Sequence, residues 1–411
     1  MSNLYFDLQD TVYDITEKYE VAIEILASVG MDQLKNEGMR KVLGKTITLE
    51  AVCKLKKIDP EALEEKLVEA IESSEVGKQI KKSVKNIEKK EIKIAGILPC
   101  PVRTPLTDAF EKWLEGENFD FSLSYELKAA SMGVDWLADS LENGEQDDLP
   151  DLFISAGFDM FFDKKLFGKY KTENIFEDIT EFSAYNEDFH KDTIELKDPL
   201  KQYAMLGVVP AVFLVNVDEL KGRELPESWE DILKEEFEGC VSLPIGDFDL
   251  FNAILLNIYK TYGKKGLEKL GRSLQQSMHP SEMVKSHIKK REKPVITIMP
   301  YFFTKMIKEN GPMKAVWPKD GAIISPIFML SKKEKKKELK PIVDFFASKE
   351  IGEILSHNGR FPSVNPNVDN QIPKENKFMW LGWDFLKTED ISMLIKTCED
   401  IFNHNSKEKS K

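Results

Sequence analysis

The sequence IKIAGILPCPVRTPLTDAF, residues 92–110, decides the fold that we expect for most of this chain. Residues 92, 94, 95, 97 and 98 are all apolar, so both faces of this strand are expected to be buried, as in a parallel strand covered by helices. The loop Pro99 to Arg103 follows, and Thr104 and Pro105 match the cap and the first position of a helix. The stretch is therefore predicted to be a βα unit whose unpaired helix amides face a ligand site beyond the strand.

More strands and helices alternate after this unit. Strands are predicted at residues 151–157, 211–215, 241–244, 294–299 and 321–330. The segment PESWEDIL, with Pro226 and Ser228 at its start, and the segment KPIVDFFASKEIGEIL are predicted to be helices. Residues 391–411 are expected to form a C-terminal helix and a charged tail. The alternation predicts an α/β fold.

Residues 1–72 are predicted to form a small all-α domain. Apolar residues between 13 and 29 recur at helical spacing and stop at Gly30. Thr48 is expected to cap a second helix, and Asp59 with Pro60 to begin a third. Residues 73–91 are rich in lysine and glutamate and are expected to form a charged linker or a solvated helix.

Composition excludes several classes of function. The chain has 411 residues and a net charge of −13, which disfavours nucleic acids and anionic membranes as general partners. No apolar run is long enough to span a membrane, and no Walker loop, dinucleotide fingerprint, GxSxG elbow or HExxH motif occurs. The sequence therefore gives no support to an enzyme.

Four widely spaced cysteines without a CxxC pair suggest reduced thiols. The first twenty residues are acidic and lack the apolar core of a secretory signal, so a cytoplasmic location is expected unless a leader is missing.

The pattern TVYDITEKYEVAIEILASVGM followed by KTITLEAVCKLKKIDPEALEEKL resembles a small helical domain of unknown function, often found beside redox and metal-handling modules. In that family the glycine-methionine turn commonly runs into a pair of cysteines. Here Gly30 and Met31 run into Asp32, Gln33 and Leu34 instead. We therefore favour an interaction or packing role for this domain, such as the docking of a protein partner.

The order of LFISAG, VVPAVFLVN, PESWEDIL, VSLPIGD and ITIMPYF, and then of VWPKDGAIISPIFML, VDFFASKEIGEIL and GRFPSVNP, resembles the solute-binding proteins of ABC importers. The resemblance is to the branch nearest the iron(III)-binding proteins, covers residues 92–385, and is most specific in its last part. It implies two α/β lobes, about 92–205 with 305–390 and about 210–304, which close on a ligand through a hinge. It also implies an ABC permease as a partner.

In this architecture the loops after successive strands line the cleft between the lobes. The residues predicted to face a ligand are Cys100, Arg103, Thr104, Ser155, Ala156, Gly157, Asp247, Asp249, Met299 and Tyr301. Arg103 offers a planar fork of donors, which suits a carboxylate or another oxyanion. The ligand is therefore expected to be a small anion, or a metal accompanied by an anion.

A metal is the second ligand that the sequence leaves open. Cys100 lies near a helix start and Arg103, which favours thiolate, and His279 could join it as a soft-metal ligand. Many iron(III) binders of this branch use adjacent tyrosines, whereas this chain has Tyr301 followed by Phe302 and Phe303. Bound iron or another metal, a cytosolic sensor or carrier, and an enzyme based on the cleft cysteine stay as alternatives to the anion-binding protein.

Overall fold

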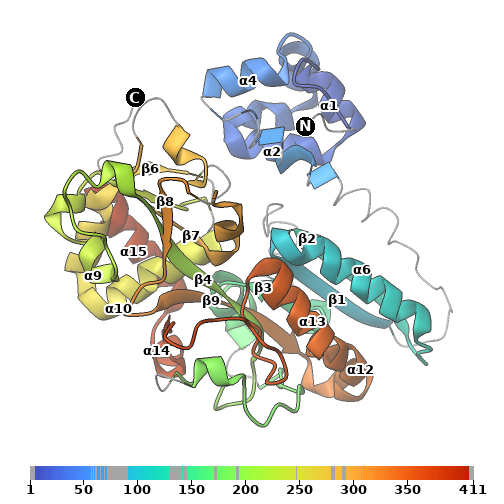
Figure 1. Ribbon diagram of the computed structural model, residues 1–411. Coiled ribbons are helices and arrows are strands. Elements are labelled where there is room, and N and C mark those ends of the chain that lie inside the picture. Colours follow the sequence, from blue (N-terminus) through green and yellow to red (C-terminus); the bar gives the residue numbers. More distant parts are fainter. Residues whose placement is uncertain are drawn as a thin grey trace.

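The predicted strand at residues 92–98 lies within β1 (Glu91–Leu98), and it belongs to a ten-stranded mixed sheet in the computed structural model (Figure 1). The structure describes residues 5–56, 58, 60, 63–64, 66–68, 70–71, 91–129, 141, 146–170, 174–190, 194–246, 248–278, 283–288, 293–308 and 310–406. The side chains at positions 24, 28, 32, 100, 129 and 248 lie outside the described part.

The strand order is β2-β1-β3-β9-β4-β7-β5-β6, with β10 beside β9 and β8 beside β4. The other strands are β2 (Ser122–Ala129), β3 (Leu152–Ala156), β4 (Ala204–Asn216), β5 (Val241–Leu243), β6 (Leu274–Ser277), β7 (Ile296–Pro300), β8 (Met313–Val316), β9 (Ala322–Ser331) and β10 (Phe378–Met379). β1 pairs in parallel with both β2 and β3, as its two buried faces predicted.

The α-helices of the main domain are α6 (Cys100–Gly116), α8 (Asp159–Phe162), α9 (Trp229–Ile232), α10 (Phe248–Ser273), α12 (Lys336–Phe346), α13 (Lys349–Glu353), α14 (Trp383–Thr388) and α15 (Ile391–Asn405). Two short helices matter for the site: the 3-10 helix η11 (Tyr301–Met306) and the π-helical turn η13 (Ile354–Asn358), which continues α13. The α/β fold class is confirmed.

Two long strands connect the lobes. All 13 residues of β4 and all 10 residues of β9 are buried, and the two strands pair antiparallel from Ala204 opposite Met329 to Ala211 opposite Ile323. β9 also pairs with β3, whereas the second half of β4 pairs with β7 and β8. Each strand carries a proline inside this pairing, Pro210 in β4 and Pro326 in β9. The two strands therefore cross from lobe 1, built on β1–β3, to lobe 2, built on β5–β7.

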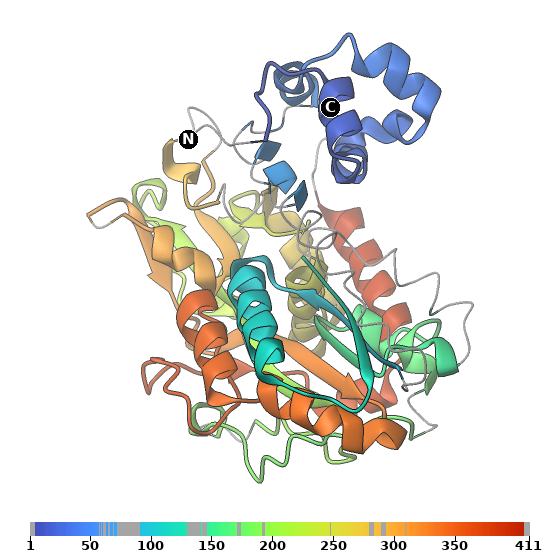
Figure 2. The same ribbon diagram turned by 90° about the vertical axis from the view of Figure 1, so that its right-hand side faces the viewer.

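Helices cover the sheet on both sides of this crossing (Figures 1 and 2). In lobe 1, α6 lies beside α12 and α13, and Phe110 and Trp113 of α6 contact Phe345 at ring-centroid distances of 5.5 and 4.7 Å. In lobe 2, α15 packs along α10, where the rings of Phe251 and Phe402 are 5.2 Å apart. The C-terminal helix that the sequence predicted therefore belongs to the core of lobe 2.

The start of α6 differs from the prediction. The helix begins at Cys100, with Pro101 in its first turn, so Thr104 is an exposed residue inside the helix rather than its cap. The amides of Val102 and Arg103 both donate to the carbonyl of Pro99, at 3.1 Å each. Because Pro101 has no N–H, the first turn offers fewer unpaired amides than we expected.

The limits of lobe 2 also extend further than the sequence suggested. β8 pairs with β4, from Phe213 opposite Val316 to Asn216 opposite Met313, so residues 313–316 lie in lobe 2. The helix η11 follows β7 directly and belongs to the same lobe. Residues 301–316 were expected partly in lobe 1, because no strand had been predicted there.

The N-terminal residues form a separate helical core. Its α-helices are α1 (Val12–Lys18), α2 (Val21–Leu26), α3 (Glu37–Met39) and α4 (Leu49–Lys56), with π or 3-10 turns at Ala27–Met31, Asp32–Lys35 and Arg40–Gly44. Gly30 has a φ of 89°, as its place at the end of the helical pattern predicted. Thr48 caps α4 by accepting from the amide of Ala51 at 3.2 Å, and Pro60 lies in the following helical segment. The predicted linker lies outside the described residues except at Glu91.

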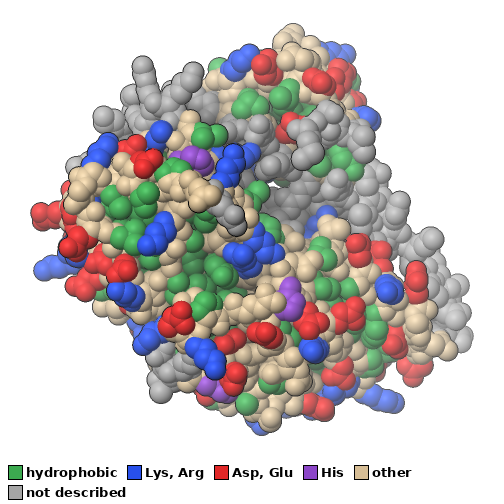
Figure 3. Space-filling model, viewed as in Figure 1, with side chains coloured by type: hydrophobic (Ala, Val, Ile, Leu, Met, Phe, Trp, Pro, Cys, Tyr) green, Lys and Arg blue, Asp and Glu red, His purple; other side chains and the backbone are tan. Residues whose placement is uncertain are grey.

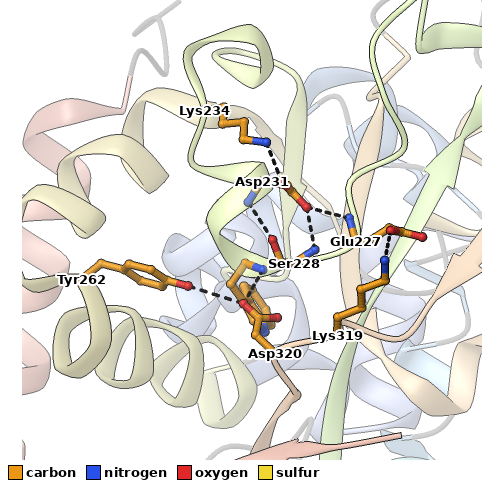
Figure 4. Close-up of polar contacts among 8 residues, drawn as sticks. Glu227, Ser228, Asp231, Lys234, Tyr262, Lys319 and Asp320 are labelled. Atoms are coloured by element: carbon orange, nitrogen blue, oxygen red, sulfur yellow. Dashed lines mark hydrogen bonds and ion pairs between the residues drawn. The ribbon is translucent and has the colours of Figure 1, made fainter. Parts of the chain in front are cut away.

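The sequence Pro318-Lys319-Asp320-Gly321, which leads into β9, fastens the crossing strand to two helices (Figure 4). Asp320 Oδ2 accepts a hydrogen bond from the amide of Trp229 at 2.9 Å and a longer one from the Tyr262 hydroxyl at 3.4 Å. The indole of Trp229, which is fully buried, donates to the carbonyl of Gly321 at 2.9 Å. The turn therefore links the start of α9, the middle of α10 and the beginning of β9.

We expect Asp320→Ala to lower the free energy of unfolding by about 1–3 kcal/mol, because it leaves the first amide of α9 without its acceptor. Its neighbour Lys319 forms an ion pair with Glu227 at the surface, so Lys319→Ala serves as the control and should change stability little. Urea denaturation followed by tryptophan fluorescence measures both. Equal effects of the two variants would contradict this account of the turn.

Candidate functional site

The loop after β3 and the first turn of α10 approach one another across the two lobes. Gly157 has a φ of 91°, and its amide donates to the carbonyl of Pro326 at 3.0 Å. A Cβ atom at position 157 would lie 2.8 Å from Cγ of Asp249, so the carboxylate of Asp249 occupies the space that the glycine leaves. Ser155 and Ala156, just before this contact, are buried at the end of β3. The structure thus brings together the residues predicted from these two loops.

Arg103 lies in the second turn of α6 and is only 4% exposed. Among the residues that the structure describes, no hydrogen bond or ion pair reaches its guanidinium; only its backbone amide and carbonyl are engaged. Helix α6 begins two residues after β1 ends, so Arg103 lies close to the carboxyl end of that strand. A buried cation without a counter-charge is costly unless a ligand supplies one.

A second basic side chain meets the only phenol of the Tyr301-Phe302-Phe303 stretch. The guanidinium carbon of Arg360 lies 5.0 Å from the ring centroid of Tyr301, and Nη1 of Arg360 donates to the hydroxyl of Thr304. Thr304 in turn donates to the carbonyl of Tyr301 at 2.7 Å. Arg360 has a φ of 49°, a left-handed backbone conformation that is uncommon in residues other than glycine. Arg360 follows η13 in lobe 1, so these contacts bridge the lobes.

Lys305 adds a third cation on the lobe 2 side of this junction. Its ammonium donates to the carbonyls of His357 and Asn358, at 2.6 and 2.9 Å, at the end of η13. Burial lowers the pKa of Lys305, and the charge of Arg360 lowers it further. Figure 3 shows basic side chains near the middle of this view, with acidic side chains below them and both kinds along the outer edges.

The segments that carry Arg103 and Arg360 are in direct contact. A Cβ atom on Gly359 would lie 2.5 Å from Cγ1 of Val102, so the backbone of the η13 turn rests against the start of α6. Arg103 is next to Val102 in the chain, and Arg360 is next to Gly359. The fold therefore places the segments that carry Arg103 and Arg360 side by side, next to the contacts that Lys305 makes with the end of η13.

A hydrogen-bonded carboxylate, that of Asp159, also connects the two lobes. The side-chain amide of Asn252, in α10, donates to both carboxylate oxygens of Asp159, in α8, at 3.1 and 2.8 Å. Burial raises the pKa of Asp159 to about 6, the hydrogen bonds from Asn252 oppose this shift, and the nearby charges of Glu399 and Asp163 add to it. The fold therefore favours the neutral form of the Asp159 carboxyl group at pH values where a free aspartate is charged.

Other predicted residues have a different environment or cannot be described. Met299 is fully buried in a separate core cluster with Leu214 and Met313, so its side chain does not face the junction. The hydroxyl of Ser155 donates to the carbonyl of Ala156 at 3.1 Å. Asp247, His279 and the side chain of Cys100 lie outside the described residues.

Sequence reasoning missed Arg360 and Lys305 as site residues. The tetrapeptide Gly-Arg-Phe-Pro supported the family resemblance, but a single arginine after a helix carries no functional signal by itself. In the described part of the chain, no three His, Cys, Asp or Glu side chains gather as a group that could hold a metal ion. The side chains of Tyr301, Lys305 and Arg360, which lie in these contacts, instead carry donors: one phenol, one ammonium and one guanidinium.

The sequence profile of a family described as bacterial extracellular solute-binding protein matches residues 147–389, which is more than half of the chain. This chain belongs to that family. A second profile, of a domain of unknown function named DUF1858, matches residues 6–63 and covers most of the N-terminal helical core. Both resemblances that the sequence suggested are therefore confirmed, and the solute-binding family is one of binding proteins rather than enzymes.

Solved structures share the fold of this solute-binding protein. The ferric binding protein from Campylobacter jejuni is 14% identical, with a TM-score of 0.54, and the match covers 76% of this chain and 99% of that one. The ferric iron-binding protein A of Mannheimia haemolytica, in an open conformation, gives the same values. The periplasmic binding protein P5PA is 16% identical with a TM-score of 0.51, covering 76% of this chain and 100% of that one. At these identities the likeness establishes the fold and not the ligand.

A comparison with curated proteins gave no significant match. Within the described residues, no helix combines the length and the apolar character that crossing a membrane requires.

We expect Gly157→Ala to push the lobes apart, because its methyl group would overlap the Asp249 carboxylate. Gly222→Ala is the control, because Gly222 has a similar φ of 89° and open space around it. This control measures the backbone strain alone, about 1–2 kcal/mol for an L-residue with such a φ. Small-angle scattering should give a larger radius of gyration for Gly157→Ala only. An unchanged radius would contradict the close approach of Gly157 and Asp249.

The raised pKa of Asp159 makes stability depend on pH. Between pH 3.8 and about 6 the folded state binds more protons at this group than the unfolded state, so its contribution to stability falls as pH rises through this window. Asp159→Asn should therefore stabilise the protein by about 1–3 kcal/mol at pH 7.5 and leave it unchanged near pH 4. Urea denaturation at both pH values measures this, with the exposed Asp218→Asn as control. Equal stabilisation at both pH values would contradict the assignment.

Proposed function

We propose that this protein binds a small anionic solute between its two lobes and passes it to an ABC-type permease. One observation carries the anionic character of the solute: Arg103 is almost completely buried, and no described residue pairs with its guanidinium. The chain as a whole has a net charge of −13, so carboxylates are abundant, yet none of those described lies within ion-pair distance of Arg103. A guanidinium presents a planar fork of donors that matches the oxygens of a carboxylate or phosphate.

The contacts at the junction support an anion better than a bare ferric ion. Hard cations prefer several anionic oxygen ligands, and the described residues there supply one phenol, that of Tyr301. The guanidinium of Arg360 already lies over the face of that phenol, and a metal cation would be repelled by it. The related ferric-binding proteins share the fold at 14% identity, which leaves the ligand of this chain to be inferred from its own residues.

Transfer to a permease follows from the membership of the solute-binding family. Its members bind small solutes, and the two crossing strands β4 and β9 provide the connection about which two lobes can close. Closure changes the surface that a permease contacts, so ligand occupancy can be read by the partner.

We expect Arg103→Met to weaken binding of the solute by about 10- to 100-fold, the loss of one or two charge-assisted hydrogen bonds. The same variant should not lower the stability of the ligand-free protein, because it removes a buried charge that has no protein partner. Lys112→Met, on the exposed side of α6, is the matched control and should bind normally.

The measurement is isothermal titration against organic phosphates, carboxylates and inorganic oxyanions, with scattering to follow closure. If none of these anions binds and the lobes do not close, the proposed function is wrong. Binding that is identical in the wild type and Arg103→Met would remove Arg103 from the site.

A further inference from the structure

Two cations from opposite lobes, Lys305 and Arg360, meet where η11 approaches the end of η13. Lys305, in lobe 2, donates to the carbonyls of His357 and Asn358 in lobe 1. In the reverse direction, Arg360 of lobe 1 donates to the Thr304 hydroxyl of lobe 2. Because each cation contacts the other lobe, the pair is assembled only when the lobes are together.

This pair lacks the negative charge that usually accompanies neighbouring cations. In the described part of the chain, neither Lys305 nor Arg360 forms an ion pair, although many other lysines do. The two side chains lie close together, because Lys305 donates to the carbonyl of Asn358, two residues before Arg360, and Arg360 donates to Thr304, the residue before Lys305. Like charges repel, so the lobes are brought together against this repulsion unless an anion lies between them.

Donors stay available at the same place. Arg360 uses Nη1 for Thr304, and no other described residue accepts from its fork. Lys305 uses two of its three N–H groups on the carbonyls of η13. The hydroxyl of Tyr301, whose ring lies under Arg360, has no hydrogen-bond partner among the described residues. Guanidinium and ammonium groups are donors that bind phosphate and sulfate strongly.

We propose that Lys305, Arg360 and Tyr301 form a subsite that selects a dianionic, tetrahedral oxyanion group on the solute. Two positive charges are neutralised by two negative ones, and a tetrahedral group presents two oxygens to the guanidinium fork and a further one to the ammonium. A monoanion leaves one cation of the pair uncompensated. Since the subsite forms from both lobes, a dianion favours closure more than a monoanion does.

This inference rests on the proposed function and deepens it, because it assigns the charge and shape of the group that is bound. Sulfate and methanesulfonate test it directly, since both are tetrahedral sulfur oxyanions but carry two charges and one. Wild-type protein should bind sulfate at least about tenfold more tightly than methanesulfonate, which corresponds to 1.4 kcal/mol. Scattering should show more complete closure with sulfate.

Lys305→Met and Arg360→Met should reduce this preference to about threefold or less, because each leaves one cation. Lys308→Met removes the same charge three residues further along the chain, at an exposed position, and should keep the full preference. Lys305 is also exposed, so Lys305→Met leaves the core unchanged. Arg360→Lys keeps the positive charge but removes the guanidinium, so it separates the effect of the guanidinium geometry from that of the charge.

Three outcomes distinguish the two proposals. If wild-type protein binds both probes equally, or if the preference for sulfate survives in Lys305→Met and Arg360→Met, the dianion subsite is wrong while anion binding stands. If neither probe binds while organic anions do, the subsite is likewise wrong. If no anion of any class binds, the proposed function itself is wrong.

Discussion

The antiparallel pairing of β4 and β9 is the constraint on which the main domain depends. Both strands are buried along their whole length, and together they join the strands of lobe 1, through β3 beside β9, to those of lobe 2, through β7 and β8 beside β4. Two of the segments at the interlobe junction follow strands that neighbour this pair: the loop after β3, which pairs with β9, and η11 after β7, which pairs with β4. The geometry of the junction is therefore set by strand pairing far from the side chains that we propose to bind the solute.

Among the described residues, the positively charged side chains at the surface and those near the interlobe junction differ in whether they form ion pairs. Most of the described lysines that form ion pairs do so at the surface, where each pair contributes little. The cations at the junction have no such partners among the described residues, and one of them, Arg103, is buried in an acidic protein. A local positive potential inside a negative molecule concentrates anions at one place and disfavours them elsewhere.

The sequence predicted those parts of the structure that depend on local pattern. The apolar run at residues 92–98 gave a buried parallel strand because both of its faces carry apolar side chains. The start of α6 was misplaced because two proline signals lie close together, and the earlier one begins the helix. Gly157 and Asp249 were both predicted to face the ligand from loops at strand ends, and the structure brings them into contact.

Arg360 and Lys305 could not be found in the same way. Their roles arise from contacts between segments more than 50 residues apart in the chain, such as the bond from Lys305 to His357. Neither residue belongs to a sequence motif whose spacing indicates a function. The left-handed backbone at Arg360 could not be predicted either, because arginine is not a residue type that favours this conformation. Met299 shows the opposite error, since a residue at a strand end can still point into the core.

The two prolines in the crossing strands have a mechanical consequence. Pro210 and Pro326 supply no N–H to the sheet, so each leaves one position near the crossing without a backbone donor, and the carbonyl of Pro326 faces Gly157 after β3. The β4–β9 ladder also has a register shift between Met205 and Gly207, so its pairing is interrupted there as well. A strand pair with missing donors and a bulge near its crossing is less rigid there than a continuous ladder, which favours this place for a change in the angle between the lobes.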